Sequence, residues 1–105
     1  MNTQFKKGIL EPCVLALLKQ RDYYGYELVE TISEYIEISE GTIYPLLKRL
    51  RDQKWVETYF VESGVGPVRK YYRLTKKGIK EAETQIDEVI KFTSGVIKIM
   101  KGQDG

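Results

Sequence analysis

The stretch Ser39–Leu50, SEGTIYPLLKRL, sets the expected fold. Its apolar residues recur at the three- and four-residue spacing of one helix face; they are Ile43, Leu46, Leu47 and Leu50. Ser39 is of a residue type that caps helix N-termini, so we expect a helix from about Glu40 to Gln53. Pro45 lies inside this helix and costs a helical hydrogen bond, which suggests a positional reason for it.

Two strands are expected after this helix, at about Val56–Glu62 and Val68–Leu74. Both are rich in β-branched and aromatic residues. Between them Ser63–Pro67 (SGVGP) supplies the glycines and proline of a hairpin turn. The second strand carries Arg69 and Lys70, which point to opposite faces of a regular strand. Both can face one ligand only if the hairpin is twisted or irregular.

Two helices are expected before the helix at Glu40–Gln53. They lie at about Gln4–Lys19 and Gly25–Tyr35 and are joined by a polar connector at Gln20–Tyr23. The first is apolar nearly all the way round, so we expect it to be buried between two layers. The second has an apolar stripe that includes Ile32 and Tyr35, with its acids off that stripe.

A last helix is expected from a Thr75 cap to about Lys101. Its seam residues alternate three and four apart, as in a heptad repeat; they are Ile79, Ala82, Ile86, Val89, Thr93, Val96 and Met100. A helix of this length extends about 40 Å, longer than so small a domain is wide. Its distal half is therefore expected to pair with another chain. The expected dimer interface is Ile86, Val89, Thr93, Val96 and Met100.

These elements predict a mainly α (α+β) fold: a winged helix-turn-helix at residues 1–74 and a C-terminal dimerisation helix at residues 75–105, packed on the first helix. The 105-residue chain is of single-domain size. Its longest apolar run, Cys13–Leu18, is too short to span a bilayer, and the N-terminus lacks a signal-peptide core. We therefore expect a cytoplasmic protein without a membrane partner.

The residue types argue against catalysis. The chain has no histidine, which removes the commonest general base and metal ligand. Its one cysteine, Cys13, lies in an apolar run, and no glycine-rich phosphate loop follows a strand. We expect no catalytic residue, no metal site and no cofactor.

Charge is distributed unevenly along the chain. Residues 22–40 hold six acids and no base, whereas residues 41–77 hold nine Lys and Arg against three acids. A short helix with a basic face can enter the major groove, and a hairpin can reach the adjacent backbone or minor groove. The candidate DNA contacts are Tyr26, Thr42, Tyr44, Lys48, Arg49, Arg69 and Lys70. Packing is the alternative role for the tyrosines, and helix capping for Thr42.

Three blocks of sequence together resemble the PadR family of bacterial transcriptional regulators. They are Tyr24–Leu28 (YGYEL), Gly41–Leu50 (GTIYPLLKRL) and Arg69–Gly78 (RKYYRLTKKG). The family places a proline in its recognition helix, as here, and the single last helix resembles its compact subfamily. The resemblance implies a homodimer of winged helices on a near-palindromic double-stranded DNA operator.

The resemblance further implies a repressor released by a small molecule, often an aromatic one. The pocket expected for it comprises Phe5, Ile9, Val89 and Phe92, with dimer packing as their alternative role. Some compact members bind flat aromatics with a tryptophan of the last helix; here the single tryptophan, Trp55, precedes the first hairpin strand instead. The alternative function is a winged helix that binds proteins and not DNA, because acids of residues 22–40 facing phosphates would repel them.

Overall fold

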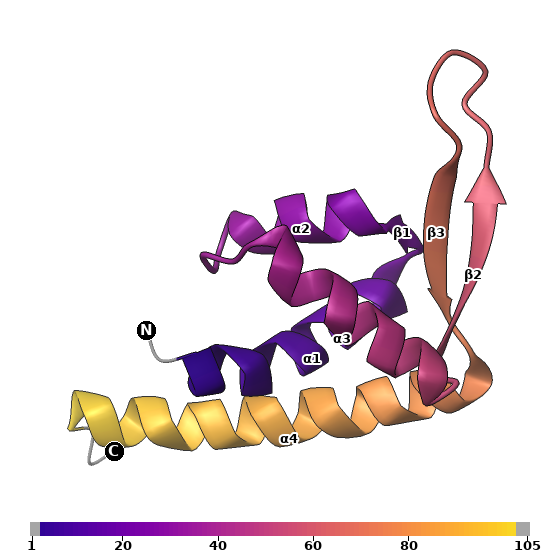
Figure 1. Ribbon diagram of the computed structural model, residues 1–105. Helices are drawn as coiled ribbons and strands as arrows, with labels where there is room; N and C mark the ends of the chain where they lie inside the picture. The colour runs from indigo at the N-terminus through magenta and orange to yellow at the C-terminus, as the bar shows by residue number, and fades with distance from the viewer. Residues whose placement is uncertain (1–2, 103–105) are drawn as a thin grey trace.

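The computed structural model describes the backbone of residues 3–102 and the side chains of residues 8–102. Three helices precede a β-hairpin and a long last helix (Figure 1). The elements are α1 (Thr3–Gln20), β1 (Tyr23–Tyr24), α2 (Gly25–Ser33), α3 (Glu40–Asp52), β2 (Val56–Val61), β3 (Arg69–Leu74) and α4 (Lys76–Lys101). This is the winged helix-turn-helix order that the sequence predicts.

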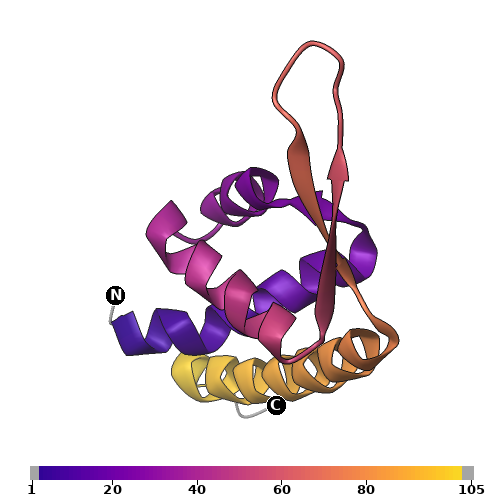
Figure 2. The same ribbon diagram turned by 45° about the vertical axis from the view of Figure 1, so that its right-hand side comes forward.

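Helix α1 is buried between two layers, as expected from its apolar surface. Val14 and Leu15 are completely buried. Figures 1 and 2 show α2 and α3 on one side of α1 and α4 along the other. The core joins these helices to the inner face of the sheet through Val56, Tyr72 and Leu74.

The sheet has three strands in the order β1-β3-β2, all antiparallel. Tyr23 lies opposite Tyr72 and Val56 lies opposite Leu74. The expectation of a polar connector over Gln20–Tyr23 is corrected here, because Tyr23 belongs to β1. A two-residue strand has no sequence period and exists only through its hydrogen bonds to β3, so the local pattern could not reveal it.

Helix α2 ends at Ser33, two residues before the expected end. Tyr35 lies beyond the helix and is 83% exposed, so its expected place in the buried stripe is wrong. The hairpin strands are also shorter than expected, since Glu62 and Val68 lie outside the β2–β3 ladder. The longer loop that results lets the hairpin project well beyond the helices (Figure 1).

The start of α4 is locked against the turn that precedes β2. The Thr75 hydroxyl accepts a hydrogen bond from the Gly78 N–H at 3.0 Å and donates one to the Lys54 carbonyl at 2.7 Å. A Cβ at position 78 would lie 1.8 Å from the carbonyl oxygen of Trp55. Glycine is therefore required where α4 crosses this turn.

The heptad seam of α4 is divided between the chain's own core and solvent. Ala82 is completely buried and Ile86 packs against the core, whereas Val89, Thr93 and Val96 are half-buried. The expectation that Ile86 serves a dimer interface stays a prediction, because its side chain packs against the core but is only partly buried.

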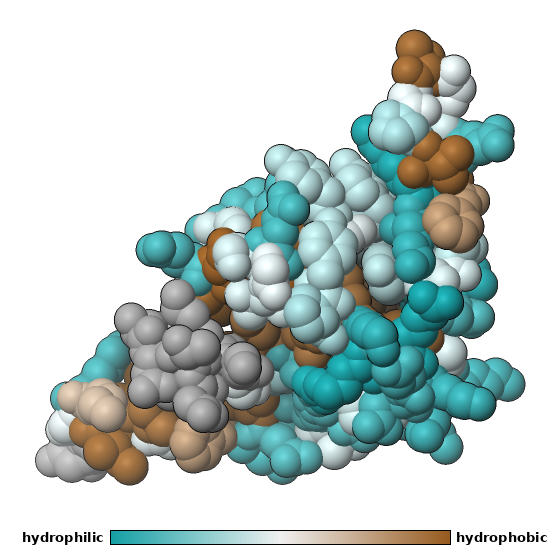
Figure 3. Space-filling view, viewed as in Figure 1, coloured by the Kyte–Doolittle hydropathy of each residue, from teal (hydrophilic) through white to brown (hydrophobic). Residues whose placement is uncertain are grey.

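Beyond the part that α1 covers, α4 is both exposed and apolar. Ile97 is 51%, Ile99 79% and Met100 78% exposed. Figure 3 shows hydrophobic surface at the C-terminal end of the helix. Separately, no helix in the described residues is long and apolar enough to cross a membrane.

Candidate nucleic-acid interface

Helix α3 presents one apolar face to the core and one polar face to solvent. Ile43, Leu47 and Leu50 are completely buried. Tyr44, Lys48 and Arg51 lie four and three residues apart, so they form one exposed stripe, here called the α3 stripe. Figure 3 shows hydrophilic side chains gathered over the C-terminal half of α3 and the base of the hairpin.

Tyr44 combines packing with exposure. Its ring lies against Gly25, where an added Cβ would come within 2.7 Å of the Tyr44 Cε1 atom. The side chain is still 41% exposed. Burial and the nearby Glu40 carboxylate raise the pKa of the Tyr44 hydroxyl, so it remains a neutral hydrogen-bond donor near pH 7. Tyr26, at the start of α2, is 49% exposed.

Thr42 occupies the first turn of α3. Its backbone N–H donates to the Ser39 carbonyl at 3.0 Å, and its hydroxyl lies 3.3 Å from the Ser39 hydroxyl. The half-buried Thr42 side chain thus helps to order the helix N-terminus, which was the alternative to a DNA contact in the sequence prediction.

The basic side chains of α3 differ in their ion-pair partners. Lys48 forms an exposed ion pair with Asp52 at 3.2 Å, a kind of pair that is readily exchanged for another anion. Arg51 is exposed and forms no ion pair within residues 8–102. Burial and the nearby Tyr44 raise the pKa of the Tyr72 hydroxyl, and the Arg51 guanidinium partly opposes this rise. The sequence prediction omitted Arg51 from the contacts, although its spacing from Tyr44 and Lys48 could have included it.

Arg49 faces α1, away from the α3 stripe. Its guanidinium forms an ion pair with Glu11, whose other carboxylate oxygen accepts a hydrogen bond from the Gln85 amide at 2.6 Å. Glu11 therefore ties α3 to α1 and α4. The ion pair turns Arg49 away from the α3 stripe, so we add Arg51 to the candidate DNA contacts, and the DNA contact of Arg49 stays a prediction.

The hairpin separates its two adjacent bases, as a regular strand requires. Lys70 lies on the same sheet face as the buried Tyr72, with its Nζ 5.9 Å from the centre of that ring. This face adjoins the α3 stripe, because Tyr44 and Arg51 both lie near enough to affect the pKa of Tyr72. Arg69 lies on the other face, with its guanidinium 4.7 Å from the ring centre of Tyr24.

The outer face of the sheet holds a cluster of tyrosines. Tyr71 stacks on Tyr59 and meets Tyr24 edge-on, both at 5.6 Å between ring centres. The Tyr59 hydroxyl donates a 2.5 Å hydrogen bond to Asp22, which raises the pKa of Tyr59. These contacts fix β1 and β2 to β3, so Tyr71 and Tyr59 stabilise the wing.

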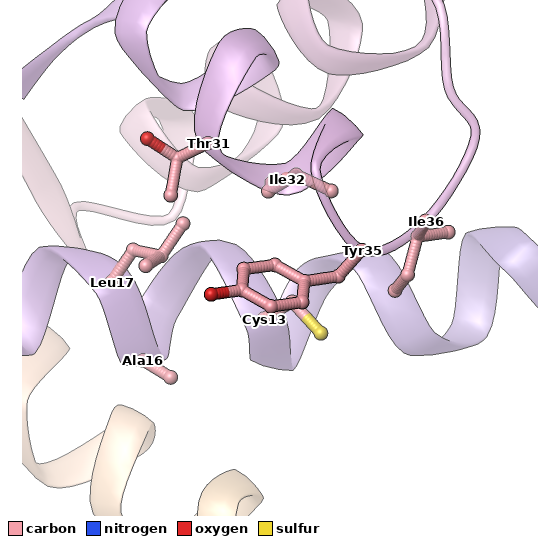
Figure 4. A pocket seen from close by; sticks show the side chains of 7 residues that line it. All are labelled: Cys13, Ala16, Leu17, Thr31, Ile32, Tyr35 and Ile36. Carbon is pink, nitrogen blue, oxygen red and sulfur yellow. The ribbon is translucent and has the colours of Figure 1, made fainter.

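The expected effector residues are only partly described. Phe5 lies outside the described side chains. Ile9 and Val89 are half-buried, and Phe92 is 68% exposed. A separate apolar hollow of ≈ 260 Å³ lies between α1 and α2 (Figure 4). It is lined by Cys13, Ala16, Leu17, Thr31, Ile32, Tyr35 and Ile36.

The three-helix core, the projecting hairpin and the exposed α3 stripe define a winged-helix protein. Residues 14–84 match the model of the transcriptional regulator PadR-like family. The chain therefore belongs to the PadR-like family of transcriptional regulators.

Solved structures of known proteins have the same fold. A PadR-like transcriptional regulator from Bacillus cereus is 36% identical, with a TM-score of 0.84 over 96% of this chain and 100% of that one. A protein from Streptococcus mutans is 33% identical, with a TM-score of 0.83 over 91% and 90% of the two chains. Bacillus subtilis PadR in complex with operator DNA is 24% identical, with a TM-score of 0.66 over 74% and 46%, and so shows the fold alone.

A curated relative is also similar. An uncharacterized protein from Lysinibacillus sphaericus is 32% identical over 98 residues, which are 90% of this chain and 86% of that protein.

Proposed function

We propose that the chain binds double-stranded DNA as a homodimer and represses transcription. The observation that carries this proposal is the α3 stripe, which adjoins the face of the wing that bears Lys70. Two neighbouring elements thereby present bases and a tyrosine hydroxyl on one side of the molecule. These hydrogen-bond donors suit double-stranded DNA, whose phosphates and base edges are hydrogen-bond acceptors.

In this proposal α3 enters the major groove and the wing lies over the adjacent backbone. Tyr44, Lys48 and Arg51 of α3 contact bases or phosphates. Thr42 at the start of α3 and Tyr26 at the start of α2 make further contacts to the DNA. Lys70 contacts phosphates from the wing, and Arg69 does so from its other face. Lys and Arg contacts to phosphates supply affinity that weakens as salt rises.

The proposed dimer forms through α4. Residues 1–74 form the DNA-binding domain of each chain, and residues 75–105 hold the two DNA-binding domains together. The exposed apolar residues of the distal helix support this assignment, because water-exposed isoleucines gain from a partner surface. Met100 joins the interface, with the half-buried Val89, Thr93 and Val96 at its edge. A two-fold dimer implies a near-palindromic operator, and the bound dimer blocks transcription from it.

An aromatic small molecule is the proposed effector. The support is that Val89 and Phe92 lie on α4 beside the proposed dimer contact. A ligand bound there would alter the spacing of the two DNA-binding domains. Ile9 of α1 and Phe5 complete the proposed pocket.

Fluorescence anisotropy with a labelled duplex from upstream of the chain's own gene tests DNA binding, with a scrambled duplex as control. We expect about a hundredfold preference for the upstream duplex and a steep loss of affinity with salt. The double variant Lys48→Ala and Lys70→Ala should reduce the salt slope by about 0.9 for each phosphate that it no longer neutralises. Unchanged affinity and slope in this variant would remove these residues from the interface.

A protein-binding winged helix is the second candidate function. Glu30 of α2 and Glu34, which follows its last residue, are exposed and form no ion pair within residues 8–102, and such acids suit a basic protein partner. This function predicts no affinity for either duplex, even at low salt, which distinguishes it from the first.

A further inference from the structure

The wing carries an exposed aromatic residue, Phe60 of β2. Its side chain is 67% exposed, although a phenylalanine ring gains free energy when it is removed from water. Figure 3 shows hydrophobic surface on the hairpin where it projects beyond the helices. Single exposed apolar residues are common, so the position of the ring decides whether it serves a contact.

The register of the hairpin places Phe60 on the face that adjoins the α3 stripe. Residues directly opposite each other in an antiparallel pair share a face of the sheet. Phe60 lies opposite Lys70, and Thr58 lies opposite the buried Tyr72. Lys70 and Tyr72 lie on the inner face of the sheet, with the Lys70 Nζ 5.9 Å from the Tyr72 ring centre. Phe60 therefore lies on the inner face, beside Lys70.

This inner face continues past the core, toward the end of the projecting hairpin (Figure 1). Phe60 lies two residues beyond Thr58 on β2, which is about 7 Å along a strand. The pair of Thr58 and Tyr72 lies beside the α3 stripe, as the effect of Arg51 on Tyr72 shows. The major groove is about 12 Å wide. With α3 in the middle of that groove, Phe60 reaches the sugar-phosphate backbone at its edge.

The adjacent Phe60 and Lys70 suit the alternating chemistry of that backbone. Its phosphates carry the negative charge that attracts a lysine. The deoxyribose rings between the phosphates are largely C–H surface, against which a flat aromatic ring can pack. Glu57 lies on the outer face of the sheet and Glu62 lies outside the β2–β3 ladder, so the register fixes neither acid beside the ring.

The outer face of the sheet holds these two residues in place. Tyr59 and Tyr71, which precede Phe60 and follow Lys70 in the sequence, stack there at 5.6 Å between ring centres. The Tyr59 hydroxyl also donates a hydrogen bond to Asp22. The strands that carry Phe60 are thus ordered before DNA binds, so less of the free energy of the contact is lost to ordering.

We propose that Phe60 packs its ring against a deoxyribose of the DNA backbone, beside the phosphate that Lys70 contacts. The proposal rests on the DNA binding proposed above and adds an uncharged contact to it. Lys70 supplies affinity that falls as salt rises, whereas burial of the Phe60 ring supplies affinity that does not depend on releasing counterions. The wing therefore retains part of its affinity for DNA at high salt.

Fluorescence anisotropy at several salt concentrations separates the two kinds of contact. Phe60→Ala should weaken binding roughly tenfold, a loss at the low end for an apolar side chain of this size. The salt slope should stay unchanged, whereas Lys70→Ala should lower it by about 0.9. The upstream and the scrambled duplex should lose affinity by the same factor, because a sugar contact reads no sequence.

Val61→Ala is the matched control. Val61 is the next residue of β2 and is also exposed, but it lies opposite Arg69 on the outer face of the sheet. This variant should bind both duplexes as tightly as the unmodified chain. A loss equal to that of Phe60→Ala would mean that the two substitutions act by loosening the hairpin, which overturns the proposal.

Phe60→Trp gives a second readout that does not depend on the stability of Phe60→Ala. The indole is also flat and aromatic, so affinity should stay within about threefold of the unmodified chain. Binding of DNA should shift the tryptophan emission to shorter wavelength as the new ring leaves water. The shift should exceed that of the unmodified chain, whose emission comes from Trp55 alone. Equal shifts would place position 60 away from DNA.

Failure of this proposal is distinguishable from failure of DNA binding itself. An unmodified chain that binds neither duplex refutes the proposed function, whereas undiminished affinity of Phe60→Ala refutes only the Phe60 contact. A lower salt slope in Phe60→Ala would mean that the ring acts by orienting Lys70, which also overturns the contact. So would dissociation of Phe60→Ala in light scattering without DNA, because it would assign the ring to a contact between two chains.

Discussion

Helices α3 and α4 both carry an apolar stripe, yet only one stripe is satisfied within the chain. In α3, Leu47 and Leu50 are completely buried. In the distal part of α4, residues 89–101, here called the α4 tip, Ile99 and Met100 are more than three-quarters exposed. The difference shows that apolar residues at helical spacing form the core of the chain in α3. In α4, by our proposal, they form the contact between two chains.

Replacing one buried and one exposed residue should separate these roles most strongly. Leu47→Ala leaves a cavity in the core and should lower the free energy of unfolding by about 2–5 kcal/mol. Ile99→Ala should change the stability of the folded monomer by less than about 0.5 kcal/mol. Urea titration at low protein concentration measures both values. Equal losses would break the comparison between the two helices.

The next largest effect concerns assembly. Ile90→Glu with Ile97→Glu places charges on the α4 tip and should yield folded monomers by light scattering. DNA affinity should then fall by roughly a hundredfold, because the second half-site no longer adds to the first. Thr84→Glu, at an exposed position of α4 outside residues 89–101, is the matched control and should remain dimeric. A dimeric double variant would exclude the tip from the interface.

Two arginines of α3 provide a finer comparison. Arg51→Ala should weaken DNA binding and lower the salt slope by about 0.9, the change expected when one phosphate is no longer neutralised. Arg49→Ala should leave the slope unchanged and instead destabilise the fold, because it leaves the half-buried Glu11 without its cation. Anisotropy at several salt concentrations and thermal unfolding distinguish the two. The reverse outcome would restore Arg49 to the interface.

The smallest effect is expected at the Lys48–Asp52 pair. Asp52→Asn removes an exposed ion pair and should change stability by less than about 0.5 kcal/mol. It should also tighten DNA binding a few-fold, since the variant has one carboxylate fewer near the phosphates. Unchanged binding would place the end of α3 away from DNA.

Several features could be predicted because they depend on local sequence. Helix α3 and its buried face follow from apolar residues at helical spacing, and the hairpin follows from two β-rich runs around Ser63–Pro67. The Thr75 cap of α4 also has the expected hydrogen bond to Gly78. The candidate site was harder to predict, because Glu11 and Tyr24, the partners of Arg49 and Arg69, lie far away in sequence.

The sequence by itself determined the order of the elements, the basic character of α3 and the wing, and the length of α4. Each depends on residue type and periodicity within a short window. Only the tertiary structure decided that Arg49 binds Glu11, that the strand face with Lys70 and Tyr72 is the one turned to the core, and that Ile86 packs against that core. Those outcomes depend on which distant surfaces meet when the core packs, and no local pattern encodes that choice.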